Sequence, residues 1–187
     1  ALGAAAASSG AVAMFHAVGI TPEAPTLEEA LHREEAEEII TVTLADLRDS
    51  LAHLGTVPDG GIDVVALGSP HFSLDEFAQL MPLLEEYRPS PAVEFIVCTN
   101  RLVFNGLQER GWLEKLQEAG VQIVVDTCVV VTPIVHAQRG VLMTNSGKFA
   151  HYSPGNIGLQ VAFGSLQECV RSGALGRVWR DERLWTN

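Results

Sequence analysis

The pattern of hydrophobic and polar positions divides the chain near residue 62. Before that point, hydrophobic residues recur at helical spacing, and the stretches between them are polar or contain proline. We expect a helix over 1–18, a short helix over 27–31 that Thr26 caps, and a third helix that ends at Gly55. The stretch 34–38 is expected to be acidic and exposed. The hydrophobic stripe of the third helix consists of Leu44, Leu47, Leu51 and Leu54.

Beyond residue 62, short hydrophobic runs alternate with amphipathic stretches. Ser73 and Glu76 predict a capping box for the helix after the first run, and Pro82 is expected to kink or split that helix. A later helical region is interrupted near Gly111, and a last helix carries Cys169 on its inner face. The runs have the composition of buried strands and cover residues 62–67, 93–97, 121–125 and 141–143.

Buried strands joined by helices are typical of a parallel sheet that is covered on both faces. We therefore predict an α/β fold with three α/β/α layers and a mostly parallel central sheet. The 187 residues, of which 47% are hydrophobic and 6% aromatic, suffice for one core, so we expect one domain over 1–187. The chain opens on Ala1 in sequence typical of a protein interior, which indicates a fragment of a longer chain. The tail from Arg171 is more basic and is expected on the surface.

Composition narrows the range of partners. Twelve basic against 23 acidic side chains give a net charge of −11, which argues against binding to nucleic acid or to a membrane surface. The first residues lack the basic start of a secretory signal and the roughly 20 uninterrupted hydrophobic residues of a spanning helix. Three cysteines at irregular spacing do not make a disulfide framework, so the sequence favours a reducing, cytoplasmic compartment.

Polar and reactive residues follow each of the four predicted strands. Ligands of open α/β sheets bind at the carboxyl ends of the strands, so these residues predict a site at one edge of the sheet. In chain order they are Ser69 and His71, then Cys98, Asn100 and Arg101, then Asp126, Thr127 and Cys128, and finally Asn145, Ser146 and Lys148.

Each of these residues also has an ordinary structural explanation. His71 can bond a loop carbonyl, and a lone Cys98 is more often packed in a core than used for chemistry. Ser146 belongs to a turn that can simply cap a helix. Cys169, at helical spacing with hydrophobic neighbours, is expected to be core. Two thiols at neighbouring strand ends still favour a soft metal such as iron or zinc.

Several common catalytic motifs are missing from the sequence. No CxxC pair occurs, which excludes zinc fingers and ribbons. The sequence also lacks GxxxxGK[ST], GxGxxG and GxSxG, so phosphoryl transfer, dinucleotide redox chemistry and serine hydrolysis lose their usual support.

Five segments resemble the large-subunit catalytic region of the aconitase X family. They are SSGAVAMFHAVGITPEAPTLEEAL, ALGSPHFSLDEF, VVDTCVVVTP, MTNSGKFAHYSPG and VAFGSLQECV, in this order over nearly the whole chain. The resemblance implies an aconitase-like fold and a hydro-lyase with an iron–sulfur cluster or iron. It also implies one of two substrates, cis-3-hydroxy-L-proline or mevalonate 5-phosphate, of which the first is preferred.

The resemblance assigns roles to individual residues. It implies that Cys98 and Cys128 are metal ligands, and that His71 and Lys148 act in catalysis. In dehydration, iron acts as a Lewis acid on the leaving hydroxyl while cations hold the carboxylate of a small anionic substrate. The implied substrate contacts are Ser69, Asn145 and Ser146, which Ser9 and His16 join. Arg101 is the second cation available at the proposed site, beside Lys148, and is expected to contact the substrate as well.

The resemblance also implies that parts of the enzyme lie elsewhere. Aconitase-like clusters use three cysteines, and Cys169 lies in the wrong kind of segment, so the third ligand is expected outside this chain. The family has a small swivelling domain or subunit that supplies a serine as base, and nothing in this sequence resembles it. We therefore expect these 187 residues to be inactive alone. The alternatives are a non-catalytic small-molecule binding domain of the same fold and an interaction module for the missing domain.

Overall fold

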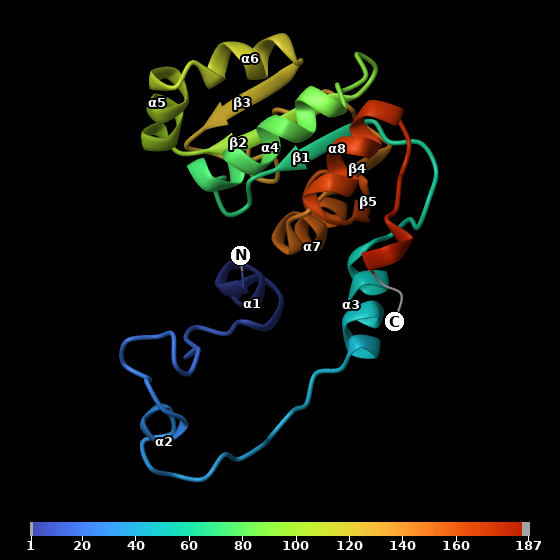
Figure 1. Cartoon of the computed structure of the whole chain (residues 1–187). Helices are drawn as coiled ribbons and strands as arrows, with labels where there is room; N and C mark the ends of the chain where they lie inside the picture. The colour runs from blue at the N-terminus through green and yellow to red at the C-terminus, as the bar shows by residue number, and fades with distance from the viewer. Residues whose placement is uncertain (1, 185–187) are drawn as a thin grey trace.

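A computed structural model describes residues 2–184 of the 187-residue chain. These residues form a five-stranded sheet in which every neighbouring pair is parallel, with the strand order β3-β2-β1-β4-β5 (Figure 1). The predicted α/β fold with a parallel central sheet is therefore confirmed. The strands are β1 (Val64–Leu67), β2 (Glu94–Thr99), β3 (Val121–Val125), β4 (Val141–Thr144) and β5 (Gln160–Phe163).

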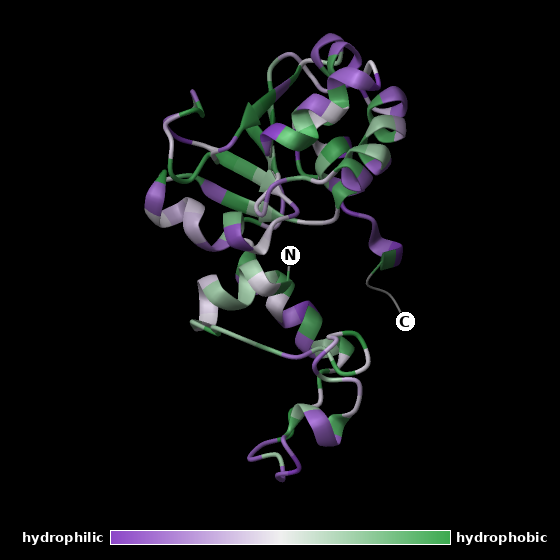
Figure 2. Ribbon diagram, turned by 90° about the vertical axis from the view of Figure 1, so that its left-hand side faces the viewer, coloured by the Kyte–Doolittle hydropathy of each residue, from purple (hydrophilic) through white to green (hydrophobic). Residues whose placement is uncertain are grey.

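The two faces of the sheet are covered differently. On one face, α4 (Leu74–Glu86), α5 (Arg101–Glu109), α6 (Trp112–Glu118) and α8 (Leu166–Leu175) bury a core that includes Phe77, Phe95 and Val170. On the other face, α7 (Gly147–Asn156) and the segment 128–137 cover a smaller core around Ile96 and Phe149. Successive side chains of each strand point to opposite faces of the sheet and so alternate between the two cores. In Figure 2 the strands are mostly hydrophobic, whereas the helices that cover them carry many hydrophilic residues.

Local signals correctly predicted most helix boundaries. Ser73 and Glu76 form the capping box of α4, and Gly111, at φ +64°, separates α5 from α6. Pro82 does not split α4, which continues through it. Proline removes the bond to the carbonyl of Ala78, and that residue is exposed, so water can satisfy the carbonyl.

Two elements were missed by the sequence patterns. Strand β5 has only four residues, and α7 contains Pro154 and two glycines, so neither has a long periodic signal. The outer edge of β5 is closed by Thr56 and Val57, whose N–H groups both donate to the carbonyl of Val161, at 2.7 and 3.1 Å.

Residues 2–54 form an arm that leaves the α/β body (Figures 1 and 2). Its helices are α1 (Leu2–Gly10), α2 (Leu27–Ala30) and α3 (Leu44–Leu54), and none of the three contains a buried residue. The expectation of one helix over 1–18 is wrong, because α1 ends at Gly10. Ala11 has φ +52°, a left-handed conformation that ends the helix, and residues 11–17 have no regular structure.

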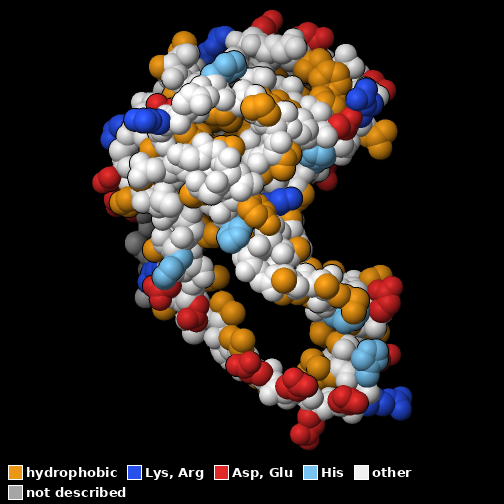
Figure 3. Space-filling view, turned by 180° about the vertical axis from the view of Figure 1, so that it is seen from behind, with side chains coloured by type: hydrophobic (Ala, Val, Ile, Leu, Met, Phe, Trp, Pro, Cys, Tyr) orange, Lys and Arg blue, Asp and Glu red, His pale blue; other side chains and the backbone are white. Residues whose placement is uncertain are grey.

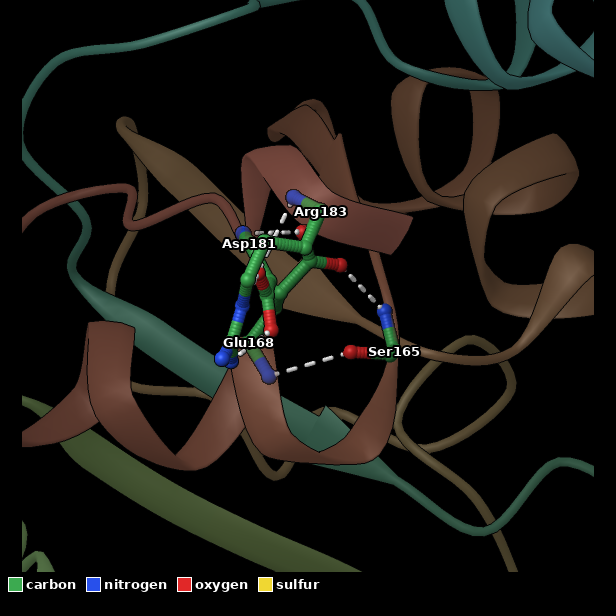
Figure 4. A network of polar contacts seen from close by, with 4 residues as sticks. All are labelled: Ser165, Glu168, Asp181 and Arg183. Atoms are coloured by element: carbon green, nitrogen blue, oxygen red, sulfur yellow. Dashed lines mark hydrogen bonds and ion pairs between the residues drawn. The ribbon is translucent and has the colours of Figure 1, made fainter. Parts of the chain in front are cut away.

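The tail is packed more tightly than its basic composition predicts. The carboxylate of Glu168, 1% exposed, accepts hydrogen bonds from the N–H groups of Ser165 (2.7 Å) and Asp181 (3.0 Å), and Arg183 donates to Asp181 (Figure 4). A 3₁₀ turn, η1 (Glu182–Leu184), follows. The expected surface tail is therefore anchored to α8 through a buried carboxylate. Among residues 2–184, no helix has both the length and the hydrophobicity that crossing a membrane requires.

Candidate functional site

A pocket of about 240 Å³ opens at the carboxyl ends of β1 and β4. Four residues that the sequence singled out line it together, although they come from three separate parts of the chain: Ser69, His71, Cys128 and Lys148. Gly68 and Pro70 complete its wall. The pocket therefore combines an ammonium, an imidazole and a thiol at the edge of a parallel sheet where ligands bind.

Ser146 joins the two turns that build this pocket. Its hydroxyl donates a hydrogen bond to the backbone carbonyl of Ser69 and accepts one, at 3.1 Å, from the N–H of Phe149. Ser146 is thus the N-cap of α7, and the helix-cap interpretation of this turn is confirmed. Ser69 and Ser146 are both buried, while Lys148, two residues into the helix, is half-buried.

The turn after β1 lies directly on β2. Gly68 has φ +91°, and a Cβ atom there would lie 2.0 Å from the carbonyl oxygen of Cys98. The N–H of Phe72 donates to that same carbonyl at 2.9 Å, and the hydroxyl of Thr99 donates to the carbonyl of Phe72 at 2.6 Å. Only glycine fits this approach, so Gly68 fixes where Ser69 and His71 lie.

The three thiols occupy different environments. Cys98 has no exposed surface and faces the smaller core, where burial raises its pKa to about 12. Cys128 packs against the same core, is half-buried, and opens on the pocket. The charge of Cys128 further raises the pKa of Cys98, and both residues belong to the same core cluster. Cys169 lies in the other core, as predicted, and burial raises its pKa as well.

Arg101 is held by Asp126, a partner that the sequence patterns did not reveal. The carboxylate of Asp126 accepts hydrogen bonds from the backbone N–H, Nε and Nη2 of Arg101 at 2.9, 3.0 and 2.9 Å. These bonds lower the pKa of Asp126, and the charge of His71 lowers it further. Asp126 has φ +60°, which is tolerated better by aspartate than by most residues. A substrate carboxylate would have to compete with Asp126 for this guanidinium.

The remaining predicted residues lie outside the pocket lining. The hydroxyl of Ser9 donates to the carbonyl of Ala5 at 2.8 Å, and Ser9 lines a separate hollow of about 320 Å³ with His53 and Gly147. His16 has a buried Nδ1 with no hydrogen-bond partner among residues 2–184. Asn145 is half-buried and is the residue between the end of β4 and Ser146.

Two cysteines among the described residues offer the donor type of a soft metal. Cys98 and Cys128 belong to the same core cluster, and Cys128 lines the pocket. Within residues 2–184, however, no group of three or more His, Cys, Asp or Glu side chains is placed to hold a metal ion. Thiolate sulfur is the donor that iron and iron–sulfur centres use, but these two described residues do not make such a site by themselves.

A parallel sheet with a pocket at its carboxyl edge, lined by an ammonium, an imidazole and a thiol, defines an α/β protein with a candidate small-molecule site at its strand ends. Family models identify it further. Residues 62–174 match the family described as "Aconitase X third domain", and residues 1–52 match "Aconitase X second domain". The chain belongs to the aconitase X family.

Proteins named as dehydratases are similar to this chain over nearly its whole length. It is 41% identical over 179 residues to the cis-3-hydroxy-L-proline dehydratase of Pseudomonas aeruginosa, over 95% of this chain and 31% of the relative. It is 36% identical to the phosphomevalonate dehydratase large subunit of Methanothermobacter thermautotrophicus, over 91% of this chain and 41% of the relative. The crystal structure of Thermococcus kodakaraensis aconitase X in its holo-form superimposes with a TM-score of 0.75 at 27% identity, covering 92% and 42% of the two chains. The chain thus spans between 31% and 42% of the length of these relatives.

Proposed function

We propose that this chain is the catalytic part of a hydro-lyase that dehydrates a small hydroxy acid, with cis-3-hydroxy-L-proline as the preferred substrate. The pocket that joins Ser69, His71, Cys128 and Lys148 carries the proposal. The 41% identity to a cis-3-hydroxy-L-proline dehydratase supports this substrate class.

Lys148 and His71 are assigned to catalysis. The ammonium of Lys148 attracts the substrate carboxylate and stabilises the negative charge that develops on it when the α-proton leaves. The imidazole of His71 lines the same pocket and can hold or move a proton at the substrate hydroxyl. The proposed substrate contacts are Ser9, His16, Ser69, Arg101, Asn145 and Ser146.

Cys98 and Cys128 are assigned to iron or an iron–sulfur cluster, with the third ligand outside this chain. When bound, iron supplies a Lewis acid for the leaving hydroxyl, which is otherwise a poor leaving group. Binding also requires the thiol proton of Cys98 to leave, because thiolates are the ligands. A small swivelling domain or subunit is the proposed partner, and the Methanothermobacter relative is itself named a large subunit.

Two alternatives are kept. Mevalonate 5-phosphate is the second substrate, because a phosphomevalonate dehydratase large subunit is 36% identical to this chain. A non-catalytic binding domain would keep the fold and the pocket without iron. Anaerobic purification distinguishes the non-catalytic binding domain from the enzyme, because an iron–sulfur protein is brown and absorbs in the near ultraviolet.

The decisive test is a chimera in which these 187 residues replace the matched segment of the Pseudomonas relative. After anaerobic iron–sulfide reconstitution, dehydration of cis-3-hydroxy-L-proline and of mevalonate 5-phosphate is measured. Lys148→Met and His71→Gln are each expected to lower turnover about 100-fold or more. The sequence has one other lysine, and Lys115→Met on α6 is the matched control that is expected to leave turnover unchanged.

Three outcomes would contradict the proposal. Full turnover by the Lys148→Met and His71→Gln chimeras would show that these two residues of the pocket take no part in the reaction. The assignment of Cys98 and Cys128 as ligands would be wrong if the folded chimera binds no iron. It would also be wrong if Cys98→Ser and Cys128→Ser leave the iron content unchanged. Robust turnover by the 187 residues alone would show that no further ligand or base is needed.

A further inference from the structure

The arm contains a run of β-branched residues without a partner. Ile39, Ile40, Thr41, Val42 and Thr43 follow one another directly, a composition that favours strands and disfavours helices. The segment 38–43 has no helix, strand or turn, and it crosses open space between α2 and α3 (Figure 1). Among residues 2–184, none forms a hydrogen bond with the backbone N–H or carbonyl groups of residues 35–42.

The side chains of this run are as unpartnered as its backbone. Ile39 is 84% exposed and Ile40 is 76% exposed, and Val42 is also mostly exposed. Isolated exposed hydrophobic residues are common, but three within four positions on an extended backbone are not. Figure 3 shows hydrophobic side chains along the arm and an open gap between the arm and the body.

The charges beside the run are all of one sign. Glu34, Glu35, Glu37 and Glu38 precede it, and Asp46 follows it. No lysine or arginine occurs between Arg33 and Arg48. A surface that docks here must therefore present basic side chains beside a hydrophobic stripe.

We infer that residues 37–43 are a β-strand that pairs with a sheet edge in another domain of an aconitase X polypeptide, one with lysine or arginine facing the glutamates. Such a strand would span about 20 Å and satisfy its backbone groups by strand addition. The family models name a second and a third domain, and the Pseudomonas relative has 69% of its length outside the match, so polypeptides of this family extend beyond the part described here. A second copy of this chain is disfavoured as the occupant, because residues 34–47 of that copy would offer no lysine or arginine to the glutamates. The inference rests on family membership and not on the proposed activity.

Hydrogen exchange tests the pairing directly. In the 187-residue chain, the amides of residues 38–42 are expected to exchange at the rates of an unfolded peptide at every protein concentration. In the chimera with the Pseudomonas relative, exchange of these amides is expected to slow at least about 100-fold. Unprotected amides in a folded chimera would overturn the inference. Protection that appears in the chain alone as its concentration rises would replace the proposed occupant by a second copy.

A proline scan distinguishes strand pairing from hydrophobic contact alone. The part of the Pseudomonas relative outside the match is added in trans, and its binding is measured for proline and alanine variants at 38–42. In a paired edge strand alternate N–H groups face the partner, so proline is expected to weaken binding more than tenfold at every second position. Alanine at the same positions keeps the N–H and controls for the lost side chain.

The proline substitutions are expected to leave the rest of the fold intact, because no described residue accepts a hydrogen bond from the N–H groups of residues 38–42. Equal effects of proline at all five positions, or effects no larger than those of alanine, would contradict strand pairing. Loss of binding in Glu37→Lys/Glu38→Lys is expected from the charge argument, and unchanged binding there would contradict the basic rim. If neither the chimera nor the mixture assembles, the arm does not dock on that polypeptide and the inference is wrong.

Discussion

The hydroxyl of Ser146 donates a hydrogen bond to the backbone carbonyl of Ser69, which joins the turn after β4 to the turn after β1. Both residues are buried, and neither turn makes the pocket alone. One hydroxyl thus caps α7 and fixes the separation between the loop that carries His71 and the helix that carries Lys148.

Ser146→Ala is expected to destabilise the chain by about 2 kcal/mol, because it removes a helix cap and leaves a buried carbonyl unsatisfied. Urea unfolding followed by circular dichroism measures this free energy. Ser9→Ala is the matched control: its hydroxyl is exposed and bonds only within α1, so its loss is expected to cost less than about 0.5 kcal/mol. Equal effects of the two substitutions would remove the structural role given to Ser146.

Gly68→Ala is expected to destabilise the chain by about 3 kcal/mol or more. The Cβ of an alanine at this position would overlap with the carbonyl of Cys98. The alanine would also have to adopt a backbone conformation with positive φ, which costs further free energy. Gly60→Ala provides the comparison, since Gly60 also has positive φ, at +104°, but nothing lies within 4 Å of its Cβ position. We expect about 1 kcal/mol there. The difference between the two melting curves measures the overlap, and a difference near zero would contradict the close approach.

The stability of the tail is expected to depend on pH through Asp181. Its ion pair with Arg183 lowers the pKa of the Asp181 carboxyl to about 2, below the usual value of about 3.9. A lowered folded pKa means that the stabilisation is complete above the unfolded pKa and is lost as the pH falls through the folded one. Asp181→Asn should therefore lower stability above about pH 5, and the difference should narrow toward pH 2.

Urea unfolding between pH 7 and pH 2.5 measures this difference. Asp59→Asn is the matched control, because it removes an exposed aspartate that has no hydrogen-bond or ion-pair partner among the described residues. A difference for Asp181→Asn that is constant over the whole range would rule out the ion pair as its source.

Thiol reactivity is expected to separate the three cysteines. Cys128 is half-buried at the pocket, whereas Cys98 and Cys169 have no exposed surface. Burial raises the pKa of Cys98 to about 12, so far less of it is thiolate at neutral pH. A disulfide reagent should therefore modify one thiol per native chain and three in denaturant. Loss of the fast phase in Cys128→Ser identifies the reactive thiol, and a second fast thiol would contradict the burial of Cys98.

Short-range signals predicted most of the α/β body. Hydrophobic runs located β1 to β4, and the Ser73–Glu76 pair located the start of α4, because both signals lie within a few residues. Strand β5 and α7 escaped because their stability comes from neighbours: β5 pairs with β4 along its whole length, and Phe149 anchors α7 in the core. The end of α1 at Ala11 depends on one dihedral angle, which composition does not encode.

The candidate site was predictable as a set of strand-end residues and less so as a set of contacts. The topology rule for parallel sheets places Ser69 and Lys148 on one edge without any coordinates. The bonds from Arg101 to Asp126 join residues 25 positions apart, and Cys128 joins the core cluster of Cys98 only once the segment 128–137 folds onto that face of the sheet. Such pairings follow from tertiary packing and have no signature in a single sequence.

Gly147, the first residue of α7, has room for a Cβ that would touch Ala5 of α1 at 3.6 Å, and Lys148 is the next residue. The arm therefore lies against the same helix turn that presents Lys148 to the pocket. A hollow of about 320 Å³, lined by Ala5, Ser9 and Gly147, lies beside this contact, on the side of α7 where α1 approaches it. The first turn of α7 is thus shared by two separate surfaces, the pocket and the seat of the arm, so the position of the arm and that of the ammonium are both referred to one turn of helix.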